Sequence, residues 1–549
     1  MGGYLSHLKA EPLETVLNAS CGPVKGNEYR HGDRSVHGYL GIPYAQPPVG
    51  PLRFKKPLPA DIWTEPRDCT QYGPRCPPSG MLHEATDFMS QEIPDEANCL
   101  TLNVFQPSWQ SKSFVSQRPV MVFIHGGGFE LGSSRDYCAY SLANTLPLKD
   151  VVLVTINYRL GILGFFTTGD DVCRGNFGLW DQTLALQWVQ KHIASFGGNP
   201  NNVTIFGQSA GGASVDLLSL SPHSRDLFHK VIPMSGCADT HFAMRTAKNE
   251  AKVCREFAEK KGFQGSGTAE LVDFLKNLSA ATISEKIGFQ HTTSGLMTFC
   301  PNFDKDFFPK PLNELRKEAP KKTVMIGCVE HEGLIFAFTN PAFTNSVDEL
   351  KRRIAIEFGD DMVENFEEVR QQIFEQYSRV DNGTTMEENL VQFVGDSMFN
   401  VGILLAAENC AKKGDDVYFY VFDYCNPDGF GQFTDLLPFK VPTHSTDLRY
   451  VLGEGVYSKF DPTEEELKMV DQMGDFYTNF AKFGNPNSPG SESAQWEKYD
   501  VSKRGRHFHI SLPNSQMRNE YHNERCEFLT EIHKNNKSYL ETFYRVVKK

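Results

Sequence analysis

The sequence predicts an α/β fold built on a large, mainly parallel β-sheet with helices on both faces. Short runs of apolar, mostly β-branched residues recur along the chain, and segments with the spacing of a helix lie between them. Strands that are apolar on both faces need a helical layer on each side, as in parallel sheets with crossover helices. The composition agrees, because 40% hydrophobic, 12% aromatic and 22% charged residues suit a folded globular protein.

The expected strands are rich in Val, Ile, Phe and Tyr, which are enriched in buried strands. They comprise residues 120–124, 151–156, 203–206, 323–329 and 417–422. Residues 179–193 and 467–483 carry apolar side chains at helical spacing, so we expect a helix in each. No linker, repeat or low-complexity stretch interrupts this alternation, and we therefore expect a single domain over residues 1–549.

The net charge and the N-terminal residues limit the partners. With 55 Lys and Arg against 68 Asp and Glu, the formal net charge is −13, which disfavours nucleic acid because a phosphate backbone requires a basic surface. The N-terminal segment contains no apolar run of signal-peptide length, and no uninterrupted apolar run long enough to span a membrane occurs anywhere. We therefore expect a cytoplasmic protein.

The N-terminus also matches the N-myristoylation pattern M-G-x-x-x-[ST], with Gly2 as the acceptor. A single myristoyl chain binds a membrane only weakly and reversibly. If Gly2 is acylated, we expect weak, peripheral membrane association. The 13 cysteines include no C-x-x-C pair, so no zinc site is expected.

The sharpest local motif is GQSAG at residues 207–211, between an expected strand and an apolar helical stretch. A nucleophile elbow has this form: a serine at a tight strand-to-helix turn, with small residues on both sides because the turn is crowded. The helix behind Ser209 would favour developing negative charge. The alternative is an ordinary glycine-rich turn.

A second motif, HGGGF at residues 125–129, directly follows the expected strand 120–124. Backbone N–H groups of glycines are not shielded by a Cβ atom, so they suit an oxyanion hole. Together with the N–H of Ala210, two of them could hold the oxygen of a tetrahedral intermediate. Taken alone, the run would more simply be a flexible loop.

A serine nucleophile needs a base and an orienting carboxylate, in the chain order Ser, Asp or Glu, then His. The sequence has 16 histidines, so spacing alone does not choose the base. Glu332 follows the expected strand 323–329, and His444 lies in a loop about twenty residues after the strand 417–422. Each could equally be a surface charge or a buried structural histidine.

Motifs spread over almost the whole chain resemble the type-B carboxylesterase and cholinesterase family of α/β-hydrolases, in particular an invertebrate, intracellular carboxylesterase. Besides HGGGF, the matching segments are residues 41–54 (GIPYAQPPVGPLRF), 98–104 (NCLTLNV), 157–165 (NYRLGILGF), 175–182 (GNFGLWDQ), 196–212 (FGGNPNNVTIFGQSAGG), 234–236 (MSG), 331–333 (HEG), 444–453 (HSTDLRYVLG) and 479–487 (NFAKFGNPN). The resemblance implies the α/β-hydrolase fold, with a large, mainly parallel, twisted sheet flanked by helices.

The resemblance also implies roles for individual residues. It makes Ser209 the nucleophile, His444 the general base and acid, and Glu332 the orienting acid. Glu332 is preferred over Glu330 because the family's acid immediately precedes a glycine. The matching oxyanion donors are Gly127, Gly128 and Ala210, and Ser235 matches a serine beside the acid. The implied reaction is hydrolysis of a small-molecule ester through an acyl-enzyme, without metal or organic cofactor.

Comparison with the family also suggests one disulfide and shows two positions at which this sequence differs from the cholinesterases or from most family members. Cys76 and Cys99 match a family disulfide, but without a signal peptide we expect the pair to stay reduced. Cholinesterases have a tryptophan in the loop between these cysteines for a cationic ligand; here Met89 stands at about that place. Gln208 replaces the usual glutamate before the nucleophile. Both departures argue against a choline ester.

Three functions are compatible with these residues. The first is a serine carboxylesterase. The second is an acyltransferase that uses the same triad to acylate a hydroxyl acceptor, which the sequence does not distinguish from hydrolysis. The third is a catalytically silent adhesion or binding protein of the same family, which the intact set of Ser209, Glu332 and His444 disfavours. The sequence does not determine the oligomeric state.

Overall fold

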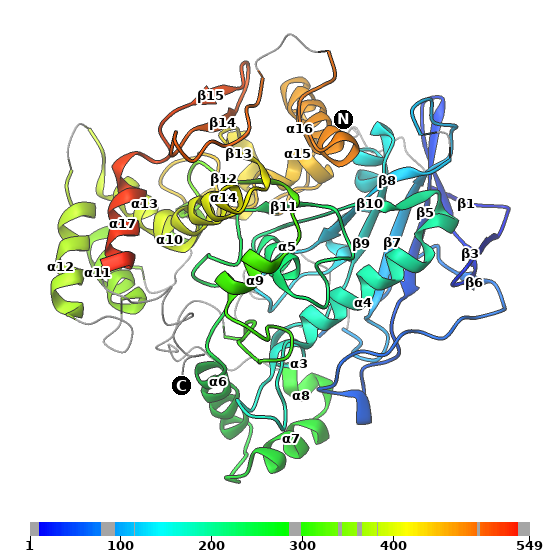
Figure 1. Cartoon of the computed structure of the whole chain (residues 1–549), viewed down its shortest axis with the longest axis horizontal. Coiled ribbons are helices and arrows are strands. Elements are labelled where there is room, and N and C mark those ends of the chain that lie inside the picture. The colour runs from blue at the N-terminus through cyan, green and yellow to red at the C-terminus, as the bar shows by residue number, and fades with distance from the viewer. Residues whose placement is uncertain are drawn as a thin grey trace.

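The computed structural model describes residues 10–77, 94–114, 116–284, 298–338, 343–358, 365–380, 383–490 and 495–535. Gly2 and Met89, which the sequence singled out, lie outside these ranges. Within them, a twelve-stranded sheet runs through the centre of the molecule, and a second sheet of three short strands lies at its N-terminal side (Figure 1).

The central strands of the large sheet are apolar on both faces, as the sequence predicts; β8 and β9 are buried along their whole length. In sheet order they are β1 (Ala10–Pro12), β4 (Asn27–His31), β5 (Arg34–Pro43), β7 (Thr101–Pro107), β9 (Val152–Ile156), β8 (Arg118–Ile124), β10 (Gly198–Gln208), β11 (Lys230–Met234), β12 (Thr323–Val329), β13 (Asp416–Phe422), β14 (His507–Ile510) and β15 (Gln516–Arg518). The small sheet consists of β2 (Leu17–Ala19), β3 (Gly22–Lys25) and β6 (Arg67–Asp68).

The pairing pattern is mixed. Neighbouring strands are parallel from β9 through β14, whereas those at the two edges pair antiparallel. The α/β class and the parallel centre of the sheet are therefore confirmed. The antiparallel strands β1, β4, β5 and β7 were not predicted, because they lack a run of β-branched residues that stands out from the surrounding Gly, Pro and polar residues.

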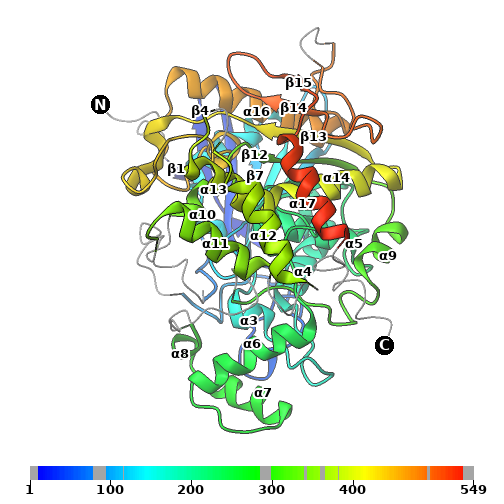
Figure 2. The ribbon, with the colours of Figure 1, turned by 90° about the vertical axis from the view of Figure 1, so that its left-hand side faces the viewer.

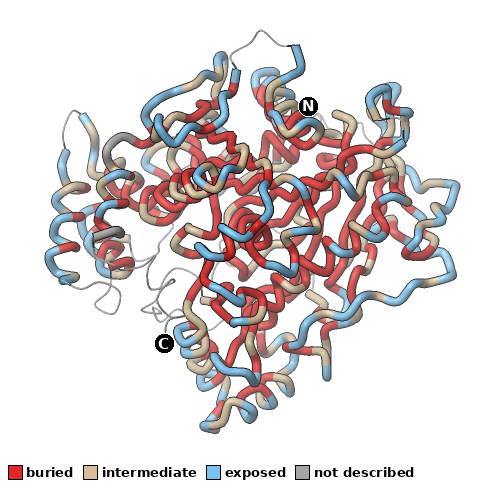
Figure 3. Tube along the Cα trace, viewed as in Figure 1, coloured by how far each residue is buried: buried red, intermediate tan, exposed pale blue. Residues whose placement is uncertain are grey.

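Helices cover both faces of the sheet (Figure 1). In β8, Val122 packs in one hydrophobic core and Phe123 in the other, so successive side chains serve opposite layers. One layer contains α4 (Phe177–His192), α5 (Ala210–Leu220), α9 (Leu312–Glu318) and α14 (Val401–Lys413), and the other contains α15 (Leu448–Leu452) and α16 (Glu464–Phe483). The buried chain in Figure 3 follows this layered core.

The remaining helices lie around this core. They are α2 (Ala139–Ala143), α3 (Gly161–Phe165), α6 (Ala247–Lys260), α7 (Thr268–Asn277), α8 (Ala280–Ser284), α10 (Leu334–Phe338), α11 (Ser346–Glu357), α12 (Phe366–Tyr377), α13 (Met386–Gly395) and α17 (Asn523–Asn535). Helices α6 to α8 group at the lower end of Figures 1 and 2, and α10 to α13 form the side that faces the viewer in Figure 2.

One helical stretch is long and apolar. Helix α13, a π-helical turn at Asp396–Asn400 and α14 run continuously from Met386 to Lys413. Its most apolar window has a mean hydropathy of 1.5, which by length and composition would suit a membrane span, but 83% of that window is buried inside the protein. It packs as a core helix.

Candidate active site

Ser209 sits at the junction of β10 and α5. Its backbone has φ 62° and ψ −126°, a conformation that costs a non-glycine residue about 1–3 kcal/mol and persists only where the surroundings fix it. The Ser209 N–H donates to the carbonyl of Met234 at 2.8 Å. A Cβ atom on Gly211 would lie only 2.1 Å from the carbonyl oxygen of Ile124, so the turn requires glycine there. The sequence motif thus forms the sharp strand-to-helix turn that was predicted.

His444 and Glu332 meet beside this turn, although 112 positions separate them in the sequence. The Nδ1 atom of His444 lies 2.6 Å from Oε2 of Glu332, and the other carboxylate oxygen accepts the Val329 N–H at 2.9 Å. Glu332 is fully buried and His444 is 5% exposed. A carboxylate here can only accept, so Nδ1 carries the proton and Nε2 of the neutral ring is left as an acceptor.

Nε2 of His444 faces the side chain of Gln208. The Gln208 amide nitrogen lies 3.1 Å from Nε2 and 3.5 Å from Nδ1. Because Nδ1 carries the proton, the amide donates to Nε2. The rings of Phe336 and Phe399 pack against the imidazole, with centroid distances of 5.1 and 4.5 Å. No hydrogen bond joins Ser209 to His444 among the described contacts. Gln208 is therefore a site residue whose contact with the histidine the sequence did not reveal.

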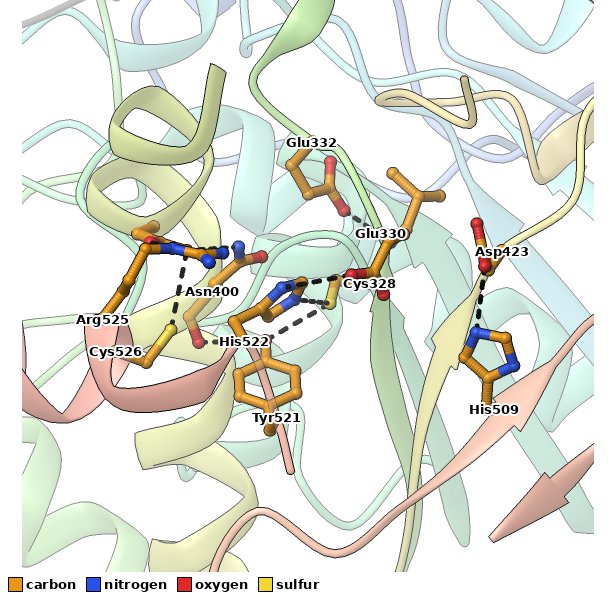
Figure 4. Close-up of polar contacts among 12 residues, drawn as sticks. Cys328, Glu330, Glu332, Asn400, Asp423, His509, Tyr521, His522, Arg525 and Cys526 are labelled. Carbon is orange, nitrogen blue, oxygen red and sulfur yellow. Dashed lines mark hydrogen bonds and ion pairs between the residues drawn. The ribbon is translucent and has the colours of Figure 1, made fainter. Parts of the chain in front are cut away.

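Glu330 and Glu332 leave the end of β12 toward different neighbours (Figure 4). Glu330 faces the C-terminal segment, where its Oε1 lies 3.8 Å from Nδ1 of His522. Burial raises the pKa of Glu330 to about 7. Of the two carboxylates, Glu332 is the one that contacts His444, as the resemblance to the family implied.

The glycine run lies directly against the elbow. Gly127 and Gly128 have φ values of 104° and 61°, and a Cβ atom on Gly126 would lie 3.1 Å from Cβ of Ser209. Ala210 is the first residue of α5 and is fully buried. The three expected oxyanion donors thus belong to two segments that pack on each other at Ser209.

Ser235 and Asp447 lie deeper in the core. Ser235 follows β11, donates its N–H to Gly327 on β12 at 2.9 Å, and its buried hydroxyl contacts no hydrogen-bond partner among the described residues. Among the described residues, the Ser235 hydroxyl therefore makes no hydrogen bond to Glu332. Asp447 is fully buried; burial, and then repulsion by Glu332, raise its pKa to about 7.

Cys76 and Cys99 form a disulfide in the structure, with Cα atoms 4.8 Å apart. The prediction that this pair stays reduced is therefore wrong for this structure, because the fold brings the two buried sulfur atoms into bonding distance whatever the compartment. Among the described residues, no group of three or more His, Cys, Asp or Glu side chains is arranged to hold a metal ion.

A serine on a strained strand-to-helix turn, set at the centre of a parallel sheet and beside a His–Glu pair, defines a protein of the α/β-hydrolase class. Comparison with known proteins identifies the family within this class. Residues 13–529 match the carboxylesterase family. The chain is 54% identical to the esterase cest-33 of Caenorhabditis elegans over 99% of both chains.

More distant relatives have the same kind of name. A medium-chain fatty acyl-CoA hydrolase precursor of Anas platyrhynchos is 34% identical over 90% of this chain and 88% of its own. Carboxylesterase 1C of Rattus norvegicus is 34% identical over 84% of this chain and 83% of its own. The protein belongs to the carboxylesterase family and is a carboxylic ester hydrolase.

Proposed function

We propose that the protein hydrolyses carboxylic esters of small molecules through an acyl-enzyme on Ser209, with His444 as general base and acid. The observation that carries this proposal is the 2.6 Å contact of His444 with Glu332 beside the strained turn of Ser209. The carboxylate fixes the ring with Nε2 as its acceptor nitrogen. Because the Gln208 amide donates to Nε2 in this structure, the Ser209 hydroxyl must take its place there for the serine to be activated.

In the proposed mechanism, Ser209 Oγ attacks the ester carbonyl while His444 Nε2 takes the hydroxyl proton. The N–H groups of Gly127, Gly128 and Ala210 hold the negative oxygen of the tetrahedral intermediate. Collapse of the intermediate releases the alcohol, which receives the proton from His444. Water then attacks the acyl-enzyme, His444 takes a proton from it, and the carboxylic acid leaves as Ser209 recovers its hydrogen.

The surroundings of His444 favour uncharged substrates. Gln208 is a neutral amide and is 2% exposed, and the rings of Phe336 and Phe399 present apolar surface. A cationic ester would find no negative side chain at Gln208, whereas an acyl or alkyl group gains free energy by leaving water. We infer that lipophilic neutral esters are the substrate class.

We also propose that the protein is cytoplasmic and that Gly2 is N-myristoylated, which would give weak membrane association. The support is the sequence pattern at the N-terminus. Mass spectrometry of the mature N-terminus tests it: the expected result is a myristoyl-glycine, and an unmodified Gly2 would refute acylation.

The central experiment compares hydrolysis of p-nitrophenyl acetate and butyrate by the wild type and by Ser209→Ala, with circular dichroism of both. We expect turnover only in the wild type, and covalent labelling of Ser209 by a fluorophosphonate. Turnover retained in a folded Ser209→Ala variant would refute the proposed nucleophile. A folded wild type that transfers the acyl group to an added alcohol faster than to water would favour the acyltransferase.

A further inference from the structure

Glu130, the residue that follows the HGGGF run, is buried and takes no part in the proposed mechanism. Its side chain is 2% exposed. Its Oε1 atom accepts two consecutive backbone N–H groups, from Thr298 at 2.6 Å and from Phe299 at 3.0 Å. Burial raises the pKa of this carboxyl to about 7, while these N–H groups and Arg245 act in the opposite direction. Burying a carboxyl costs free energy of folding, so a buried carboxyl that binds another segment in this way suggests a functional role.

The loop to which Glu130 belongs is strained. Gly127, Gly128 and Phe129 all have positive φ, and Phe129 at 61° is a non-glycine residue in the left-handed region, which costs about 1–2 kcal/mol. Inside the loop, the Glu130 N–H donates to the carbonyl of Gly127 at 3.0 Å. The Phe129 carbonyl accepts the N–H of Gly161 at 2.7 Å. Such a backbone keeps its shape only where contacts from outside the loop determine it.

A second buried glutamate, Glu250, binds the same backbone segment, residues 298–300, and among the described residues it makes no hydrogen bond to the loop of Glu130. Oε1 of Glu250, on α6, accepts the N–H of Cys300 at 3.3 Å, and its Oε2 pairs with Arg245 at 3.0 Å. Glu130 and Glu250 therefore share the backbone of residues 298–300 between them. Of these two carboxyls, Glu130 is the one that is part of the chain carrying the oxyanion donors.

We propose that Glu130 is a positioning residue of the oxyanion hole. By holding the backbone of Thr298 and Phe299, it fixes the strained loop in the conformation that presents the N–H groups of Gly127 and Gly128 toward the carbonyl bound at Ser209. The inference rests on the proposed function, because it needs Ser209-dependent acyl transfer to be observable. It adds a residue that neither the motif nor the family comparison assigns.

The test compares Glu130→Gln and Glu130→Leu with Glu250→Gln. The amide oxygen of Gln can still accept one N–H, whereas Leu accepts none, and Glu250→Gln weakens the same outer segment without touching the loop. We expect kcat on p-nitrophenyl butyrate to fall about tenfold or more in Glu130→Leu, with KM within about twofold, since lost oxyanion donors lower kcat. Glu130→Gln should recover part of the loss, and Glu250→Gln should stay within about twofold of the wild type.

A second readout separates positioning from general destabilisation. A trifluoromethyl ketone that adds to Ser209 places an oxyanion in the hole, so its affinity should fall by the same factor as kcat, while inhibition by the butyrate product is unchanged. Equal losses in the Glu130 and Glu250 variants, or a loss confined to KM, would overturn the inference while leaving the esterase intact. Absence of Ser209-dependent turnover in the wild type would instead refute the proposed function, and the inference with it.

Discussion

Replacing Gln208 by glutamate tests the electrostatics of the site most directly. The amide nitrogen of Gln208 lies 3.1 Å from Nε2 of His444 and donates to the neutral ring. A carboxylate at this place would attract the protonated ring instead. At about 4 Å and an effective dielectric constant of about 20, the attraction is about 4 kcal/mol as an upper bound. One pH unit corresponds to about 1.4 kcal/mol, and burial of the new carboxylate opposes its own ionisation, so a shift of about 1–2 pH units is expected.

The assay is the pH profile of kcat/KM for p-nitrophenyl butyrate from pH 5 to pH 9, with Gln208→Glu beside the wild type. The acid limb of the Gln208→Glu profile should move to higher pH. With a raised pKa, His444 is already protonated at these pH values and does not act as a base. The control Gln208→Met removes the amide without adding charge, and its acid limb should stay within about half a pH unit of the wild type. Superimposable profiles for Gln208→Glu and the wild type would refute the view that this side chain controls the charge on the base.

Three further outcomes are expected. Glu332→Gln should lower kcat by about 10³–10⁴-fold, since an amide favours the wrong tautomer of His444, whereas Glu330→Gln should change kcat less than about threefold; comparable losses would contradict the assignment. Asp181→Ala should lower the free energy of unfolding in urea by about 3–5 kcal/mol, because it leaves Arg159 charged and unpaired with both side chains at most 2% exposed; a change below about 1 kcal/mol would be inconsistent with a buried pair. Glu357 is buried and its pKa is raised from 4.5 to about 7, so the folded state binds its proton more tightly and stability is lost as pH rises from about 4.5 to 7; Glu357→Gln should therefore gain about 2 kcal/mol at pH 8 relative to pH 5, and a pH-independent difference would contradict the shift.

The sequence predicted the elements whose pattern is local. Residues 323–329 coincide with β12 and residues 417–422 lie within β13, because buried parallel strands are continuous runs of apolar residues. The helices at 179–193 and 467–483 were found to within three residues at each end. The antiparallel strands β4 and β5 were not predicted, although they pair as a local hairpin, because neither contains a run of apolar β-branched residues: β4 is mostly polar, and β5 mixes polar residues with glycines.

In the candidate site, too, the sequence predicted the local features but not the contacts between distant residues. The turn at Ser209 and the glycine loop at 126–128 need small residues at fixed positions, so the sequence motifs alone predict both. Burial and pairing of Glu332 with His444 needed either the family resemblance or the structure, because 16 histidines and many acids offer no local distinction.

By itself the sequence determined the fold class, the nucleophile elbow and the glycine loop, since each rests on the backbone preferences of neighbouring residues. Only the tertiary structure decided which neighbours meet across long separations: Gln208 with His444, Glu330 with His522, and Glu130 with the backbone of Thr298. The physical reason is that a turn is set by the few residues that form it, whereas a buried polar contact is set by how strands and helices from distant parts of the chain pack together.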